Sequence, residues 1–322
     1  MNTSSSPSHR ASAAPSAGNW PMPDQRFDVT RAGQRALVIA GGGAAGNAWA
    51  LGIIAGLADS GADVSRADLV IGTSSGSTVA AQITSGTRPS DLYASILAEQ
   101  PPARATALRR GPASGVSGQS YLDWSNAVIA SAADASDMRR RMGAAALERD
   151  ESDGAEGIRW RDVVARRLPR AEWPDQRVLI TSVDARTGEP VVFDRSSGVD
   201  LVDAVAASTS AMNPYPIGEG RYLNGSYRRS ENADLAAGYG RVLILVPFGG
   251  RTRVPLEWGM DLSAQVSDLE GGGSLVETVY PDATTRDLFD ANALDPATRL
   301  QAARGGYAQG RSLAGQLVGF WG

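Results

Sequence analysis

The sequence predicts an α/β protein, built as a three-layer sandwich with a mixed, mainly parallel central sheet and a helical insertion. Twice near the start of the chain, a short apolar run leads into a glycine-containing turn and then into a helix-forming segment. This order is typical of parallel strands with helices on the faces of the sheet. Further short apolar runs return in the second half of the 322 residues, after a long stretch without strand character.

The first strand-turn-helix unit begins with the apolar run ALVIA at 36–40, which we expect to be a strand. The segment GGGAAGNAWALGIIAGLADSG follows, and we expect a turn and a helix whose apolar residues, from Trp49 to Leu57, cover a broad face. Gly61 is suited to end this helix. In the second unit, DLVIGT is the expected strand and GSTVAAQITSG the expected helix, stopping at Gly86.

The middle of the chain, about 101–174, is the expected insertion. Its segments 121–150 and 160–168 have helical character, and sheet structure returns at 177–185, 189–194, 241–248 and 274–280. Residues 1–30 are rich in Ser, Ala and Pro and cannot bury a core, so we expect a disordered leader. Residues 31–322 are then one α/β domain that contains the insertion.

The composition excludes several kinds of active site. The chain has no cysteine, one histidine (His9, in the leader) and no lysine, so all 31 basic residues are arginine. A Ser-Lys dyad and Cys/His zinc sites are therefore excluded, and a Ser-His-Asp triad would need the leader histidine. We expect no metal and no organic cofactor.

The net charge of −4 gives no basic footprint for nucleic acid. Neither a secretory signal nor a membrane span is visible, so the expected location is cytoplasmic. Peripheral contact with a membrane and the oligomeric state are left open by the sequence.

Gly72, Ser74 and Gly76 form a Gly-x-Ser-x-Gly motif between an expected strand and an expected helix. A sharp turn at this point presents a serine hydroxyl as a nucleophile. Ser75 is the neighbouring candidate, but it lacks the flanking glycines. Ser74 is thus the expected nucleophile, and Gly72 and Gly76 form its elbow.

The glycine loop has two functional interpretations. Gly41, Gly43 and Gly46 fit the Gly-x-Gly-x-x-Gly pattern of a dinucleotide site, for which Asp59 or Asp63 would be the acidic residue. Alternatively, the N–H groups of Gly41, Gly42 and Gly43 form an oxyanion hole at a helix N-terminus. The second interpretation is favoured, because successive parallel strands would bring this loop and Ser74 to the same edge of the sheet.

Three segments resemble the patatin-like phospholipase family: GGGAAG, GTSSG, and the block from Ala204 to Pro247 that contains YLNGSY. The resemblance extends over about 37–247. It implies a Ser-Asp dyad without a catalytic histidine, and lipid or other acyl esters as substrates. It also implies that the glycine loop supplies the oxyanion hole.

Asn224 stands where the family has the dyad aspartate, and Ser226 replaces the second glycine of the turn. A neutral amide has no useful basicity near neutral pH. Four explanations remain open: natural divergence with another carboxylate as base, an engineered substitution, a protein that binds acyl groups or runs a different reaction, and deamidation of Asn224. Natural divergence is favoured by a small margin, and the carboxylates considered are Glu219, Glu231 and Asp234.

The expected function is that of a serine acyl hydrolase or acyltransferase attenuated at Asn224. A non-hydrolytic acyl-binding protein and an acyltransferase for a small-molecule product are the alternatives. The insertion is either a lid over the lipid pocket or an amphipathic helix packed on the sheet. As a lid, it would use Tyr121, Trp124, Val128 and Ile129, with the arginines 139–141 meeting anionic head groups.

Overall fold

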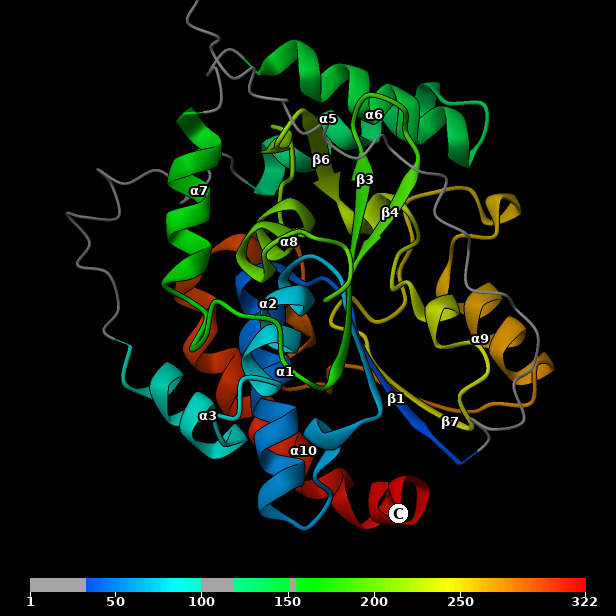
Figure 1. The fold of residues 1–322 in the computed structure, drawn as a ribbon. Helices are drawn as coiled ribbons and strands as arrows, with labels where there is room; N and C mark the ends of the chain where they lie inside the picture. The colour runs from blue at the N-terminus through cyan, green and yellow to red at the C-terminus, as the bar shows by residue number, and fades with distance from the viewer. Residues whose placement is uncertain (1–32, 100–117, 151–154) are drawn as a thin grey trace, which may run out of the picture.

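The computed structural model describes residues 33–99, 118–150 and 155–322 (Figure 1). The expected leader, including His9, and the insertion segments 100–117 and 151–154 lie outside the described residues. An eight-stranded mixed sheet with helices on both faces confirms the predicted fold class.

The strands follow the spatial order β5-β6-β3-β2-β1-β7-β8, and β4 pairs with β3. Neighbours from β3 through β2, β1 and β7 to β8 are parallel, whereas β4, β5 and β6 form antiparallel pairs at the other end. Their bounds are β1 Arg35–Ile39, β2 Leu69–Gly72, β3 Arg177–Asp184, β4 Pro190–Phe193, β5 Tyr215–Ile217, β6 Gly220–Asn224, β7 Arg241–Leu245 and β8 Leu275–Val279.

The helices are α1 Gly43–Asp59, α2 Ser75–Ile83, α3 Pro89–Leu97, α5 Gly118–Ser131, α6 Ala135–Arg149, α7 Ala155–Ala165, α8 Leu201–Ser208, α9 Leu262–Gly271 and α10 Arg299–Trp321. Short 3-10 turns connect several of these elements, including Gly225–Tyr227 directly after β6. In the described ranges, no helix combines the length and the hydropathy needed to cross a bilayer.

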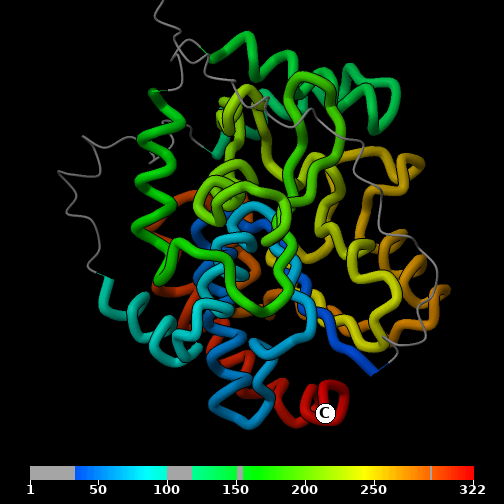
Figure 2. Tube along the Cα trace, in the orientation of Figure 1, coloured from blue at the N-terminus to red at the C-terminus, as the bar shows by residue number. Residues whose placement is uncertain are grey.

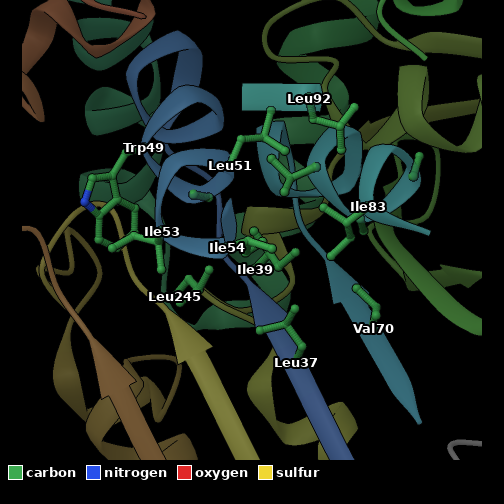
Figure 3. Close-up of a cluster of buried hydrophobic side chains, with 14 of the residues drawn as sticks. Leu37, Ile39, Trp49, Leu51, Ile53, Ile54, Val70, Ile83, Leu92 and Leu245 are labelled. Carbon is green, nitrogen blue, oxygen red and sulfur yellow. The ribbon is translucent and has the colours of Figure 1, made fainter. Parts of the chain in front are cut away.

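Alternation along β1 explains why both faces of the sheet are covered. Leu37 and Ile39 pack in the core on the α1 side, whereas Ala36 and Val38 pack in the core on the α9 side. Figure 3 shows the first of these cores, with Trp49 and Ile53 of α1 beside the strand residues. A strand buried on both faces is typical of a parallel sheet enclosed by helices.

Helix α10 packs along α1, which carries the glycine loop at its N-terminus (Figure 2). Glycines allow this close approach: a Cβ placed on Gly306 would lie 2.3 Å from the Trp49 carbonyl oxygen. The Trp49 indole also donates to Gln309 Oε1 at 3.1 Å. These contacts fix α1, and with it the glycine loop.

Helices α5 and α6 lie across the sheet end near β3 and β6 (Figure 1). They form a separate core with the turn after β6, in which Ile129, Met138 and Tyr227 are buried. Helices α5 and α6, which lie in the segment expected to be an insertion, therefore pack beside the segment that carries Asn224.

Candidate active site

The carboxyl ends of β1 and β2 bring the glycine loop and Ser74 together. The two strands are parallel, and Ile39 pairs with Gly72 at their ends. A Cβ on Gly41 would lie 3.0 Å from Ser74 Cβ and 3.6 Å from Ser74 Oγ. Gly41 therefore lies directly against the Ser74 side chain.

Ser74 has an unusual backbone conformation, with φ 53° and ψ −127°. Among the non-glycine residues that the structure describes, only Ser74 and Asn232 have positive φ. Such a conformation costs about 1–3 kcal/mol and persists only where the surroundings enforce it. Here the Ser74 N–H donates to Ser208 Oγ at 2.9 Å, and the Ser77 hydroxyl donates to the Ser74 carbonyl at 2.6 Å.

At the two flanking positions of the motif there is no room for a side chain, so glycine is required. A Cβ on Gly76 would lie 2.0 Å from the Ile39 carbonyl oxygen, and one on Gly72 would lie 2.5 Å from Ser77 Cα. No side chain fits at either distance. The two glycines allow α2 to start against β1 and to hold Ser74 at the sheet edge.

Asn224 ends β6 and is brought against Ser74. Its Nδ2 donates to Ser74 Oγ at 2.9 Å, and its Oδ1 accepts the Ser226 N–H at 3.0 Å. A backbone N–H can only donate, so the amide oxygen must face Ser226 and the NH₂ group must face Ser74. Ser74 Oγ is therefore an acceptor in this pair, and position 224 offers no acceptor for the hydroxyl proton.

A buried network of hydrogen bonds connects the Ser74 elbow to the turn that follows Asn224. Asn232 has no solvent exposure, and its Nδ2 lies 3.0 Å from Thr73 Oγ1, 3.2 Å from Thr181 Oγ1 and 3.0 Å from the Gly225 carbonyl. Thr73 and Thr181 also share a 3.0 Å hydrogen bond. Because Thr73 precedes Ser74 and Gly225 follows Asn224, this network sets the spacing of the two site residues.

Backbone donors of the glycine loop differ in their availability. The Gly42 N–H donates to Ser75 Oγ at 2.9 Å. Within the described ranges, the N–H groups of Gly41 and Gly43 have no protein acceptor. Gly43 and Ser75 are also the first residues of α1 and α2, where N–H groups lack intrahelical partners and the helix dipole favours negative charge.

Ser74 and Asn224 line a cavity of about 1030 Å³. We group its other lining residues by the elements that carry them: the apolar arm is the set that belongs to the α5 and α6 core, and the polar arm is the set carried by α1, α2, α3, α10 and the segment of α7 and the residues that follow it. The apolar arm includes Tyr121, Ile129, Met138, Tyr227, Val254 and Met260. The polar arm includes Asn47, Thr78, Gln82, Glu99, Trp160, Arg166, Arg167 and Arg299.

Among the three alternative carboxylates, only Glu231 lines the cavity. Glu219 is exposed in the turn between β5 and β6, and Asp234 is held by two hydrogen bonds from Arg228, of 2.9 and 2.7 Å. The Glu231 carboxylate is buried, and it accepts from the Ser230 hydroxyl and from Gln265 Nε2. Burial raises the pKa of Glu231 to about 7.

We expect Glu231→Gln to reduce the pH dependence of stability. The folded-state pKa is raised, so the folded protein keeps a proton that the unfolded chain releases, and stability falls as pH rises from about 4.5 to about 7. Relative to the parent, Glu231→Gln should gain up to about 3 kcal/mol in unfolding free energy between pH 5 and pH 8. Urea unfolding at both values measures this, with exposed Glu219→Gln as control. Equal behaviour of the two variants would contradict the prediction.

Other residues singled out in the sequence occupy different places. Tyr121 and Ile129 line the cavity, whereas Trp124 and Val128 pack against the adjoining core. The arginines 139–141 do not line it: Arg139 donates to the Gly188 carbonyl, and Arg140 and Arg141 pair with Asp137. The interpretation of these arginines as head-group ligands is therefore not supported.

The two acidic residues that the dinucleotide interpretation requires are engaged in hydrogen bonds with other side chains and backbone of the protein. Asp59 accepts the Tyr307 hydroxyl at 2.9 Å, and Asp63 accepts from the backbone and hydroxyl of Ser65. Gly42 lies against Pro247, where a Cβ would come within 2.6 Å. The glycine loop therefore packs against Pro247 and against Ser74.

Sequence reasoning missed Ser208, Thr181 and Asn232, which hold the Ser74 and Asn224 segments in place. Ser208 and Thr181 carry no motif or spacing signal, because their partners lie 134 and 108 residues away along the chain. Asn232 also lies in no recognised motif, and only its positive φ, known from the structure, marks it.

Comparisons with solved structures found matches at low sequence identity, two of which are VipD and ExoU. VipD from Legionella pneumophila matches with a TM-score of 0.40 and 13% identity, over 88% of this chain and 67% of that chain. The type III effector protein ExoU matches with a TM-score of 0.39 and 16% identity, over 88% of this chain and 53% of that chain. The chain thus spans about half the length of ExoU. A comparison with curated protein sequences gave no significant match.

The sequence model of the patatin-like phospholipase family matches residues 37–237. This range contains the glycine loop, the Ser74 elbow and the turn of Asn224, and it covers more than half of the 322 residues. The protein therefore belongs to the patatin-like phospholipase family.

Proposed function

We propose that this protein is a serine acyl hydrolase or acyltransferase in which Ser74 is the nucleophile and Asn224 occupies the place of the dyad base. One observation carries the proposal: Ser74 Oγ lies 2.9 Å from Asn224 Nδ2 and beside Gly41, and all three residues line the cavity. A carbonyl group can enter there from the cavity.

The reaction would begin with attack of Ser74 Oγ on the ester carbonyl carbon. The carbonyl oxygen becomes negative, and the N–H groups of Gly41, Gly43 and Ser75 are the available donors for it. Preorganised backbone donors of this kind are a large contribution to acyl-transfer catalysis. The helix N-termini at Gly43 and Ser75 favour the same charge.

Asn224 limits this reaction. Its NH₂ group donates to Ser74 Oγ, so Ser74 must lose its proton to solvent water or to the substrate rather than to residue 224. Loss of a positioned base removes about 10²–10⁴-fold of rate, while oxyanion donors and binding retain some catalysis. The proposal therefore predicts slow but Ser74-dependent turnover.

The apolar arm is suited to the acyl chain. Its lining residues Tyr121, Ile129 and Met138 offer aromatic and aliphatic surface in the cavity that Ser74 lines, with the Arg253 guanidinium 5.5 Å from the centre of the Tyr121 ring. Apolar burial favours a hydrocarbon chain by roughly 0.8 kcal/mol for each CH₂ removed from water. Lipid esters or other long-chain acyl esters are thus the proposed substrates.

The second candidate is an acyl-binding protein without hydrolytic activity, which the donor orientation of Asn224 favours. Treatment with a fluorophosphonate and peptide mass spectrometry separates the two candidates. A label on Ser74 that is absent from Ser74→Ala supports the enzyme. Folded protein that stays unlabelled at Ser74 after prolonged reaction favours the binding protein.

A further inference from the structure

The polar arm runs from Ser74 along neighbouring faces of two helices. Ser74, Thr78 and Gln82 are spaced four residues apart and all line the cavity, as do Gly43, Asn47 and Leu51 of α1. Residues four apart share one face of a helix. At a rise of about 1.5 Å per residue, Gln82 lies roughly 12 Å from Ser74 along α2.

Hydrogen bonds hold the far end of this arm together. Gln82 Nε2 donates to the Arg167 carbonyl at 2.9 Å, and Asn47 Nδ2 donates to Gln82 Oε1 at 3.4 Å. Arg299 donates to Asn47 Oδ1 at 2.8 Å and to both Glu99 oxygens, at 2.8 and 2.7 Å. The Arg299 charge is thus fixed in position and already paired.

Arg167 is charged and unpaired by any carboxylate of the described residues. Its guanidinium carbon lies 5.4 Å from the centre of the Trp160 ring. Arg167 is an exposed residue, yet partial loss of water around its guanidinium and the nearby Arg299 lower the pKa of Arg167. Arg166 likewise makes no ion pair with the described residues.

Arg166, Arg167 and Arg299 thus line the same cavity as Glu99, and of the three only Arg299 pairs with that carboxylate. An incoming oxyanion would offset the repulsion between Arg167 and Arg299 and would find the planar Arg167 group held against Trp160. Arginine binds phosphate and carboxylate groups through paired N–H donors. Glu99 is engaged by two hydrogen bonds from Arg299, and its charge offsets only part of the effects that lower the pKa of Arg167.

We propose that the end of the polar arm, around Arg166 and Arg167, is a binding subsite for an anionic group, a phosphate or a carboxylate, on the alcohol portion of the ester. The assignment to the alcohol portion rests on the proposed function, in which the acyl chain takes the apolar arm. Arg167 is the residue that determines the preference for anionic over neutral substrates. Trp160 and Gln82 position it.

The test measures binding rather than turnover, so that it is independent of catalysis. The full chain with Ser74→Ala is titrated with octyl phosphate, octan-1-ol and inorganic phosphate by calorimetry. Octyl phosphate should bind at least about tenfold more tightly than octan-1-ol, as expected for a charged hydrogen-bonded pair. Arg167→Gln should remove most of this preference and change octan-1-ol affinity less than about twofold.

Arg66→Gln is the matched control, because the Arg66 side chain is 86% exposed, pairs with no carboxylate of the described residues except Asp63, and lies outside the cavity lining. Equal affinities for octyl phosphate and octan-1-ol, or equal losses in Arg167→Gln and Arg66→Gln, would overturn the proposal. Inorganic phosphate that binds as tightly as octyl phosphate would identify a free anion as the ligand and overturn the assignment to an ester. Failure of Ser74 to react with a fluorophosphonate would reject the proposed function without changing these binding results.

Discussion

Replacing Asn224 by aspartate should raise ester hydrolysis by about 10²–10⁴-fold. The side chain has two partners, the Ser226 N–H at 3.0 Å and Ser74 Oγ at 2.9 Å. One carboxylate oxygen can keep the bond from Ser226 while the other accepts the Ser74 hydroxyl proton, which the amide cannot do. Rates of p-nitrophenyl octanoate hydrolysis at neutral pH measure the change.

Asn213→Asp is the charge-matched control for this prediction, because Asn213 lies outside the cavity lining and, among the described residues, its side chain bonds only to Glu156. The control should leave the rate within a few-fold of the parent. If Asn224→Asp has a rate no higher than Asn213→Asp while its thermal unfolding is cooperative, residue 224 is not the place of the missing base.

Gly76→Ala should lower the free energy of unfolding by about 3 kcal/mol or more. The new Cβ would lie 2.0 Å from the Ile39 carbonyl oxygen and 2.7 Å from the Ala40 carbonyl oxygen. Both are backbone atoms at the end of β1, so relief requires α2 to move away from the sheet. The same movement would displace Ser74, and activity should fall with stability.

Gly315→Ala provides the control, because Gly315 is an exposed residue of α10 with no atom within 4 Å of an added Cβ. Alanine is a better helix former than glycine, so this variant should be equal to the parent or more stable by up to about 1 kcal/mol. Urea unfolding of both variants measures the difference. Equal stabilities would show that the elbow accommodates a Cβ at position 76 and that steric exclusion of a side chain does not require glycine there.

Local sequence patterns predicted the elements that carry the site. The expected strand 36–40 corresponds to β1, and the expected strand at 177–185 corresponds to β3. Both are apolar runs bounded by turn residues, and their burial on both faces removes the period-2 alternation of an exposed sheet. The glycine spacing likewise predicted a turn between strand and helix at Gly41 and at Ser74.

The short β5–β6 hairpin and the helix α8 were not predicted. β5 has three residues and contains a proline, so its apolar pattern is too short to indicate a strand. Its pairing with β6, and the pairing of β6 with β3, depends on contacts far along the chain. The sequence therefore located the Asn224 turn by family resemblance and not by secondary-structure pattern.

The orientation of the side chains in the site could not be predicted from the sequence either. That Asn224 presents its NH₂ group to Ser74 follows from the Ser226 N–H, a tertiary detail of one turn. The insertion arginines 139–141 have the composition of an anion site, yet they bond to Gly188 and Asp137. The arginines that do line the cavity are Arg166, Arg167, Arg251, Arg253 and Arg299, and no sequence pattern connects the three segments that carry them.

The coupling between Ser74 and Asn224 tests the central claim most directly. Ester hydrolysis is measured for the parent, Ser74→Ala, Asn224→Asp and the double variant, each checked for cooperative unfolding. We predict that Asn224→Asp raises the rate only where Ser74 is present, and that the double variant is no faster than Ser74→Ala. A gain that persists in the double variant would show that the new carboxylate acts without Ser74, and would contradict the assignment of Ser74 as the nucleophile.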